Sequence, residues 1–395
     1  MRLAILGTRG IPARYGGFET FAEELALRLV ARGTEVTVYC EANGTDQPGE
    51  YRGIRLVHIP ATACGPLTTV LFDLRCLWHA RNSYDVVYML GYGAAPFCLI
   101  PQLWGTDVWL NVDGIEWARG KWNGAAKLYF KTMEWLSTWV PDRIIADADG
   151  IRAHLESRHR LSSPCSVIPY GAPVADTPPD ASLLRKWNLE PGGYYLAVAR
   201  IEPENHIREI IEGYRAHETN IPLVVAGNHM VTTDYARNLR TLAGPRVRLV
   251  GGVYDRDELR ALRYHASAYF HGHSVGGTNP SLLEALGCGN LVIAHDNIFN
   301  REVVGDIGFY FSSSTAIPAL LKAVESLSPV ETAALASKAQ TRIREAYDWS
   351  AIAERYLDLL QIHCGQIKVN ALLPGTIPAE KKAGISAGLG RRNLT

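Results

Sequence analysis

The chain has 395 residues with 40 basic and 40 acidic side chains, so its formal net charge is zero. A chain of this length exceeds one ordinary hydrophobic core and predicts two domains. The charge balance disfavours a dedicated nucleic-acid binder, because such proteins usually carry a basic excess. Hydrophobic residues make up 47% and charged residues 20%, which is typical of soluble globular proteins.

The cysteines and the first residues bear on the compartment. Seven cysteines form no C-x-x-C pair, which disfavours a disulfide framework or a zinc site and favours a reducing compartment. The start, MRLAILGTRG, lacks the apolar segment of a secretory signal. No run of 18 apolar residues predicts a membrane span. The sequence therefore predicts a cytoplasmic protein.

In the first half, short apolar segments alternate with amphipathic ones. Residues 17–32 place apolar side chains on one helical face, and Gly33 ends that pattern. A strand, a helix and a second strand in succession predict a parallel sheet. Several strands are apolar almost throughout, as in sheets that are buried on both faces. The expected strands are 2–6, 35–40, 54–59, 84–90, 107–112, 143–146 and 166–169.

The second half repeats this alternation after a Pro- and Gly-rich segment, 172–192, which predicts a linker with a short helix. The expected strands are 194–199, 222–226, 246–250, 268–271 and 290–294. The expected helices are 206–216, 234–242, 256–266, 281–287, 315–325, 331–346 and 349–362. The remainder, 364–395, has the composition of a disordered tail. Two doubly wound α/β domains would place a ligand cleft between the carboxyl ends of their sheets.

The first motif, GTRGIPARYGGFETF at 7–21, follows one expected strand and opens a helix. Gly16 and Gly17 lie at the helix start, where free N–H groups and the helix dipole favour an anion. A plain turn is the alternative, but Arg9, Arg14 and Tyr15 in the same loop favour a ligand site. The spacing matches neither the dinucleotide fingerprint nor the P-loop, which disfavours dehydrogenases and P-loop NTPases.

Arg200 follows a strand of the second half and should face the cleft, where a guanidinium suits a diphosphate. A surface salt bridge is the more common role for a single arginine, so only its position favours a binding role.

The segment 271–294, HGHSVGGTNPSLLEALGCGNLVIA, is the most specific stretch of the chain. It predicts a strand, a Gly-rich loop that offers backbone N–H groups, a helix and a further strand. Glu284 lies one turn inside that helix, where a carboxylate can accept both hydroxyls of a ribose. The apolar residues around Glu284 disfavour a merely solvated role. His271 and His273 have no further metal ligand nearby in the sequence, so packing or hydrogen bonding is favoured over metal binding.

Together these motifs resemble the GT-B glycosyltransferases of family four. IPYGAPV at 168–174 and DWSAIAERYLDLL at 348–360 are similar to that family's strand before the second domain and its final helix. GTRGIPARYGGFETF, NVDGIEWARGKW (111–122) and GHSVGGTNPSLLEA (272–285) resemble the subgroup that contains bacterial rhamnosyltransferases of capsule and cell-wall polysaccharide assembly. The resemblance covers residues 1–362. It implies an acceptor-side domain (1–172), a nucleotide-sugar domain (173–347) and a helix (348–363) that crosses back to the first domain.

The resemblance also implies roles for single residues. Gly16 and Gly17 would approach the donor's phosphate or sugar, Arg200 would bind its diphosphate, and Glu284 would bind its ribose. Backbone N–H groups of Gly277, Thr278 and Asn279 would hold the phosphate and the sugar. The full expected donor-binding set is Arg9, Gly16, Gly17, Asn205, His273, Gly276, Gly277, Thr278, Asn279 and Glu284.

Two positions depart from the wider family. Asn205 replaces a lysine and Gly276 replaces a glutamate that contacts the donor sugar. His206, Arg208 or Arg9 are candidates to replace the missing cation. The subgroup shares both departures, which favours a different donor sugar, such as the 6-deoxy sugar rhamnose, over an inactive enzyme.

The segment 104–139 holds six of the nine tryptophans, and four basic residues without an acid lie between Arg119 and Lys131. Such a face suits an anionic membrane surface, and a core helix with a solvated basic face is the equal alternative. Asp113 and Glu116 end the preceding strand, and either could position or deprotonate the acceptor hydroxyl.

The family resemblance implies a retaining reaction by front-face attack, without a metal or a cofactor, in which Arg200 and backbone dipoles stabilise the leaving diphosphate. ADADG at 146–150 contains the letters of a metal-binding DxD motif, but its place before a helix favours a helix cap. Asp113, Glu116 and Arg200 form the expected catalytic set.

We therefore expect a glycosyltransferase that moves L-rhamnose from dTDP-rhamnose to a glycan or polyprenyl-diphosphate-linked saccharide in bacterial surface polysaccharide synthesis. UDP-glucose or UDP-N-acetylglucosamine are alternative donors, and peripheral contact with the inner face of the plasma membrane is a further hypothesis. The alternative classes are an epimerase on the same fold, a glucan phosphorylase, which would need a pyridoxal lysine, and a non-catalytic scaffold subunit.

Overall fold

The computed structural model describes residues 1–13, 16–42, 47–230, 232–363 and 365. Arg14, Tyr15 and, apart from Gly365, the predicted tail 364–395 lie outside the described residues. The chain falls into two units, Met1–Ala353 and Glu354–Thr395. Both sheets and the site below lie in the first unit. The predicted domain bounds and the crossing of helix 348–363 to the first domain stay predictions.

The first sheet confirms the predicted parallel α/β architecture. Its eight described strands have the order β3-β4-β2-β1-β5-β6-β7-β8, and only the β3–β4 pair is antiparallel. The short strand β3 was not predicted. The strands are β1 Arg2–Leu6, β2 Glu35–Glu41, β3 Glu50–Tyr51, β4 Ile54–Ile59, β5 Val86–Leu90, β6 Asp107–Asn111, β7 Arg143–Ala146 and β8 Cys165–Val167.

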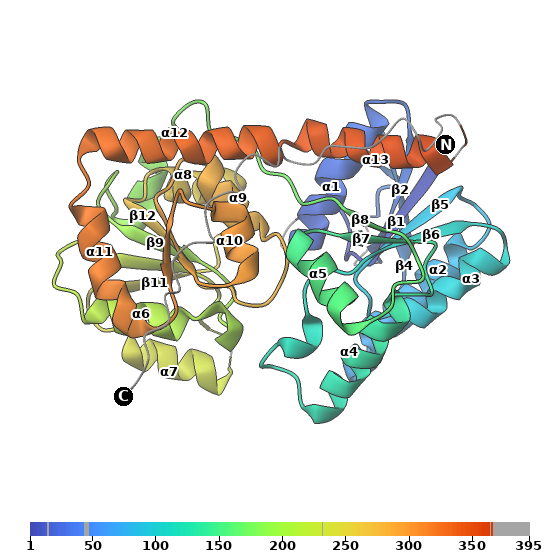
Figure 1. The fold of residues 1–395 in the computed structure, drawn as a ribbon, viewed down its shortest axis with the longest axis horizontal. Coiled ribbons are helices and arrows are strands. Elements are labelled where there is room, and N and C mark those ends of the chain that lie inside the picture. Colours follow the sequence, from blue (N-terminus) through green and yellow to red (C-terminus); the bar gives the residue numbers. More distant parts are fainter. Residues whose placement is uncertain (14–15, 43–46, 231, 364, 366–395) are drawn as a thin grey trace, which may run out of the picture. The chain divides into compact units, whose positions relative to one another are not determined.

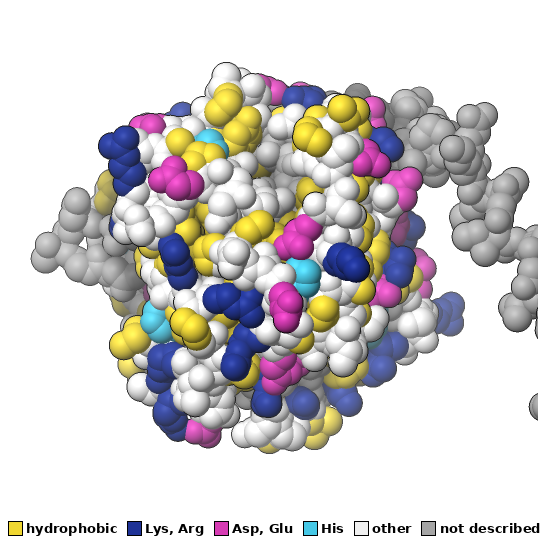
Figure 2. Space-filling model, turned by 90° about the vertical axis from the view of Figure 1, so that its left-hand side faces the viewer, with side chains coloured by type: hydrophobic (Ala, Val, Ile, Leu, Met, Phe, Trp, Pro, Cys, Tyr) yellow, Lys and Arg dark blue, Asp and Glu magenta, His cyan; other side chains and the backbone are white. Residues whose placement is uncertain are grey.

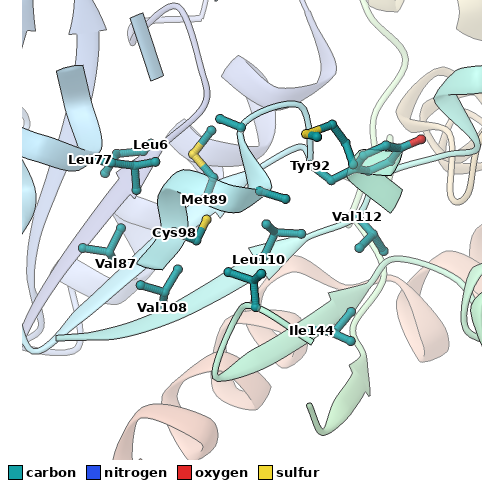
Figure 3. Close-up of a cluster of buried hydrophobic side chains, with 14 of the residues drawn as sticks. Leu6, Leu77, Val87, Met89, Tyr92, Cys98, Val108, Leu110, Val112 and Ile144 are labelled. Atoms are coloured by element: carbon teal, nitrogen blue, oxygen red, sulfur yellow. The ribbon is translucent and has the colours of Figure 1, made fainter. Parts of the chain in front are cut away.

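Helices pack on both faces of this sheet (Figure 1). They are α1 Gly17–Val30, α2 Thr68–Ala80, α3 Leu99–Leu103, α4 Gly124–Ser137 and α5 Asp149–Arg158. Figure 3 shows apolar side chains of α2 and of strands β1, β5, β6 and β7 in one cluster. Tyr92 lies at one end of this cluster with its hydroxyl turned outward (Figure 3), and that oxygen accepts a hydrogen bond of 2.8 Å from the Glu116 N–H. The core thereby fixes the loop that follows β6.

The second sheet has six described strands, all parallel, in the doubly wound order β11-β10-β9-β12-β13-β14. They are β9 Tyr195–Val198, β10 Leu223–Ala226, β11 Val247–Gly251, β12 Ala268–His271, β13 Val292–His295 and β14 Phe309–Phe311. The helices that follow the linker are α6 Ile207–Arg215, α7 Asp234–Leu242, α8 Arg256–Tyr264, α9 Pro280–Gly287, α10 Ile298–Val304, α11 Ile317–Glu325, α12 Pro329–Ala346 and α13 Trp349–His363. The predicted linker helix is a 3₁₀ turn at Ala181–Trp187.

The surface charges, the lengths of the apolar helices and the cysteines can also be described. On the face in Figure 2, basic, acidic and hydrophobic side chains are interspersed, which agrees with the zero net charge of the sequence. No helix among the described residues is long and apolar enough to cross a membrane. The six described cysteines are free.

Candidate functional site

A cavity of about 830 Å³ opens where loops from the carboxyl ends of both sheets meet. Parallel strands direct their following loops to the same edge, so motifs far apart in the sequence converge there. Twelve of the thirteen predicted site residues line this cavity: Arg9, Gly16, Gly17, Asp113, Glu116, Arg200, His273, Gly276, Gly277, Thr278, Asn279 and Glu284. Asn205 is not among the lining residues.

The loop between β12 and α9 forms one wall of the cavity. Gly276 has a φ of 138°, which strains any other residue. The Asn279 side chain caps α9 by accepting a hydrogen bond of 3.0 Å from the Ser281 N–H. Pro280 begins the helix and has no N–H, so the backbone donors that could face a ligand here belong to the loop before it.

An aspartate from the first sheet holds this loop. Asp147, which follows β7 and is 1% exposed, accepts a hydrogen bond of 3.0 Å from the Thr278 N–H. Its main-chain oxygen also accepts from the Thr278 hydroxyl. A Cβ atom at Gly277 would lie 1.9 Å from Asp147 Oδ1, so glycine is required there. Burial and the nearby Asp113 raise the pKa of Asp147 well above its usual range.

This contact corrects the helix-cap interpretation of ADADG. The residue that caps α5 is Ala148, which has no side chain to accept a hydrogen bond. The first-turn N–H groups of Asp149 and Gly150 instead donate to Glu302 of α10, at 2.8 and 2.9 Å. The motif therefore joins the two sheets' domains.

Glu284 faces the cavity and is held by a residue that sequence reasoning missed. Arg263 of α8, whose side chain is 7% exposed, approaches Glu284 Oε2 with its Nη2 at 2.7 Å. The same Nη2 donates to the Ser281 hydroxyl at 3.2 Å. A buried, hydrogen-bonded guanidinium fixes the carboxylate's orientation. No motif in the sequence distinguishes Arg263 from the other arginines of α8.

The loop between β1 and α1 also lines the cavity. Glu19 accepts a hydrogen bond of 3.0 Å from the Arg9 N–H. A Cβ atom at Gly16 would lie 1.9 Å from Glu19 Oε2, so this carboxylate packs directly on the glycine. A Cβ atom at Gly17 would lie 3.7 Å from Pro280 Cγ. The start of α1 therefore lies beside the start of α9.

Arg200 belongs to a cluster of charges from both domains. Its Nη2 lies 3.6 Å from Glu202, and its side chain is 48% exposed in the cavity. Arg119 approaches Glu116 at 2.5 Å, Glu202 at 3.9 Å and Glu204 at 3.8 Å. Lys121 lies 3.8 Å from Glu116 and 3.9 Å from Glu202. Arg119 and Lys121 therefore line the cavity. Both belong to the basic segment that the sequence analysis considered for a membrane surface.

Asn205 has a structural role. It is 3% exposed, and its amide donates to the Arg200 main-chain oxygen at 2.8 Å. Of the candidate replacement cations, Arg208 pairs with Glu212 on α6, and neither it nor His206 lines the cavity. Arg9 does line it. The expectation that Asn205 binds the donor is not supported by this arrangement, because its amide points to the backbone behind Arg200.

Asp113 and Glu116 both line the cavity, but their surroundings differ. Glu116 is occupied by Arg119 and by the Trp122 indole N–H at 3.0 Å. Asp113 has a left-handed φ of 48°, and its N–H donates to the Asn111 side chain at 2.7 Å. Burial raises the pKa of the Asp113 carboxyl, and the positive charge of Arg119 opposes this shift. The carboxyl better suited to accept a proton is that of Asp113.

His271 and His273 stack at a ring-centroid distance of 4.4 Å. Burial lowers the pKa of His271 well below its usual range, and burial together with Arg200 and Arg119 lowers that of His273 to about 3. No group of three or more His, Cys, Asp or Glu that could hold a metal ion occurs among the described residues.

The tryptophans of 104–139 divide between the interior and the surface. Trp109 is buried, and Trp117 and Trp122 donate hydrogen bonds to Glu134 and Glu116. Trp104, Trp135 and Trp139 are exposed. Of the basic residues considered for a membrane surface, Arg119 and Lys121 line the cavity, and membrane contact through this segment stays a hypothesis.

Two models of known protein families match the sequence. Residues 1–173 match a domain of unknown function, DUF1972, and residues 183–346 match the glycosyl transferases group 1. Among curated proteins, none matches the sequence.

Solved structures share the fold over nearly the whole chain. Sucrose-phosphate synthase from Thermosynechococcus elongatus superposes with a TM-score of 0.76 at 18% identity, covering 93% of this chain and 100% of that one. HepE from Anabaena, in complex with UDP and glucose, gives 0.71 at 17%, covering 92% and 100%. A glycosyltransferase from Rickettsia africae gives 0.70 at 13%, covering 93% and 99%. The chain is therefore a glycosyltransferase with a group 1 domain in residues 183–346 and a GT-B fold.

Proposed function

We propose that the chain transfers a sugar from a nucleoside-diphosphate sugar to a saccharide acceptor. The arrangement that carries this proposal is the loop 276–279 at the start of α9, with Glu284 on the same helix and Arg200 across the cavity. The Thr278 N–H is engaged by Asp147, so the N–H groups of Gly277 and Asn279, with the guanidinium, suit a diphosphate, and a carboxylate fixed by Arg263 suits a ribose. HepE, which shares the fold, was crystallised with UDP-glucose.

In the proposed reaction, an acceptor hydroxyl forms a bond to C1 of the donor sugar on the face from which the diphosphate leaves. The bond between C1 and the diphosphate oxygen breaks, and Arg200 with the loop N–H groups stabilises the charge that develops there. The hydroxyl proton passes to the leaving phosphate, or to Asp113 if that carboxylate acts as base. Retention follows from the resemblance to family four, and no metal or cofactor is assigned to any step.

The donor sugar we favour is L-rhamnose from dTDP-rhamnose. Gly276 stands where the wider family carries a sugar-contacting glutamate, and its φ of 138° does not suit a glutamate. A 6-deoxy sugar has one hydroxyl fewer for such a carboxylate to bind. UDP-glucose and UDP-N-acetylglucosamine are the alternative donors.

The acceptor we propose is a glycan or polyprenyl-diphosphate-linked saccharide of bacterial surface polysaccharide. Exposed apolar side chains on α3 and α4 and just after them support peripheral membrane contact, and they are Leu103, Trp104, Leu128, Trp135 and Trp139. Tryptophan favours the membrane interface. Vesicles of anionic phospholipid should bind the protein, and the double variant Trp135→Ala, Trp139→Ala should bind less. Unchanged binding of that variant, relative to Val330→Ala on exposed α12, would contradict membrane contact through this face.

Thermal unfolding with a panel of nucleotide sugars tests the proposed function. The panel contains dTDP-rhamnose, UDP-glucose, UDP-N-acetylglucosamine and GDP-mannose. A ligand at about 100 times its dissociation constant adds about 2.7 kcal/mol of stability. We expect a shift with one donor, lost in Glu284→Ala and kept in the control Glu345→Ala on exposed α12. No shift with any of the four would contradict the proposed donor class.

A further inference from the structure

The end of the cavity on the first domain differs from the rest in its charge. Glu41 at the end of β2 lines it, together with Thr69, Phe72 and Asp73 of α2 and Phe130 of α4. Thr69 lies one helical turn before Phe72 and Asp73, so the three residues share one face of that helix. We call these five residues the acidic end.

Asp73 is the unusual residue of the acidic end. Asp73 is 5% exposed. Its Oδ1 atom is buried and has no hydrogen-bond partner. Among the described residues, no Lys or Arg forms an ion pair with Asp73, and the charged neighbour that acts on it is Glu41. A buried carboxyl with an unmet hydrogen-bonding capacity in a cavity wall is a place for a polar ligand group.

Burial raises the pKa of Asp73 to about 8, and Glu41 contributes in the same direction. The carboxyl therefore carries its proton near neutral pH. In that form it offers one hydroxyl donor and one carbonyl acceptor. A sugar hydroxyl is both donor and acceptor and complements either oxygen. The rings of Phe72 and Phe130 add apolar surface beside it.

Anionic ligand groups do not suit the acidic end. A carboxylate or phosphate placed there would be desolvated beside Asp73, on which burial and the Glu41 charge act in the same direction. Arg200, Arg119 and Lys121 are engaged with carboxylates at the domain interface. The charges of the cavity thus separate a cation-bearing part, which suits the diphosphate, from a part that excludes anions.

We propose that the acidic end binds the accepting sugar of the acceptor and selects against an anionic ring, with Asp73 hydrogen-bonded to one of its hydroxyls. This inference rests on the proposed function and adds to it the class of the accepting residue. It concerns that residue alone, and phosphate groups further along the acceptor lie outside it.

Two probes differ in one charged group: p-nitrophenyl glucoside and the corresponding glucuronide, which is anionic. Binding to the full chain is measured by saturation-transfer NMR titration at pH 7 without donor. We expect the glucoside to bind and the glucuronide to bind at least about tenfold more weakly, the equivalent of one lost hydrogen bond or more.

Substitutions at Asp73 test whether the probe binds at this residue. Asp73→Leu should lower glucoside affinity about tenfold, whereas Asp73→Asn, which keeps a donor and an acceptor, should stay within about threefold. Asp306→Leu at an exposed site serves as control, and melting temperatures show that each variant is folded.

The proposal is overturned if the glucuronide binds as tightly as the glucoside, if neither probe binds, or if Asp73→Leu has no effect. The nucleotide-sugar panel is run on the same samples. A donor-induced shift without glucoside binding refutes this inference alone, and glucoside binding without any donor-induced shift refutes the proposed donor chemistry instead.

Discussion

Replacing Asp73 by asparagine should stabilise the protein at neutral pH. The carboxyl's pKa is raised from 3.8 to about 8 by burial, so the folded protein holds a proton that the unfolded chain has released over this range. Folded-state stability from this proton is complete below pH 4 and is lost as the pH rises towards 8. Linkage gives a loss of about 4 kcal/mol at pH 7 and about 2 kcal/mol at pH 5.

Asparagine has no such proton, so Asp73→Asn avoids this pH-dependent loss while keeping the volume and the hydrogen-bonding groups. Urea unfolding followed by tryptophan fluorescence at pH 5 and pH 7 measures the difference. The stability gain of the variant should be larger at pH 7 by about 2 kcal/mol. Asp306→Asn, at an exposed position, should show no such pH dependence. An equal effect of Asp73→Asn at both pH values would refute the assignment of a protonated carboxyl.

Three further predictions concern the cavity wall. Arg263→Gln removes the cation that orients Glu284 and should weaken nucleotide-sugar binding about tenfold by calorimetry, and unchanged affinity would show that Glu284 is positioned without it. Gly277→Ala places a methyl group 1.9 Å from Asp147 Oδ1 and should lower the melting temperature, and a second substitution, Asp147→Ala, should restore part of the loss, whereas additive effects of the two changes would contradict the clash. His273, whose pKa is lowered to about 3, stays neutral in the folded protein while the unfolded chain takes up a proton below pH 6.5. Stability should therefore fall by about 2 kcal/mol between pH 7 and pH 5, and His273→Gln should lack this component in denaturant unfolding at the two pH values.

The strands and loops of the site could be predicted from the sequence because two short-range rules sufficed. Short apolar segments located the described strands except β3 and β14, and parallel order brought their following loops to one edge. Gly16, Arg200 and Glu284 are far apart in the sequence, yet all three line the same cavity.

The contacts that hold the site could not be predicted in the same way. Asp147 and Thr278 are 131 residues apart, and neither belongs to a pattern that names its partner. Arg119 was assigned by its neighbours in sequence to a basic face, but the turn after β6 directs it towards Glu204. The sequence shows which residues are neighbours along the chain. The roles of Asp147 and Arg119 depend instead on which distant loop they contact in the fold.

The role of Asn205 also could not be predicted from its motif. A motif position that carries a cation in the wider family suggested a donor contact here. The shorter amide instead closes the turn behind Arg200 through a 2.8 Å hydrogen bond to its main-chain oxygen. A substitution within a binding motif can thus change a ligand contact into support for the neighbouring ligand residue.

The backbone of Gly114, in the loop after β6, lies so close to Gly276 that a Cβ atom there would be 2.4 Å from Gly276 Cα. The DUF1972 half and the group 1 half therefore meet glycine to glycine at the cavity. In protein engineering, the halves cannot be treated as interchangeable modules. A chimera whose first half carries a residue other than glycine at position 114 would place its Cβ atom against Gly276 of the group 1 half, so donor specificity should be transplanted as a pair of loops.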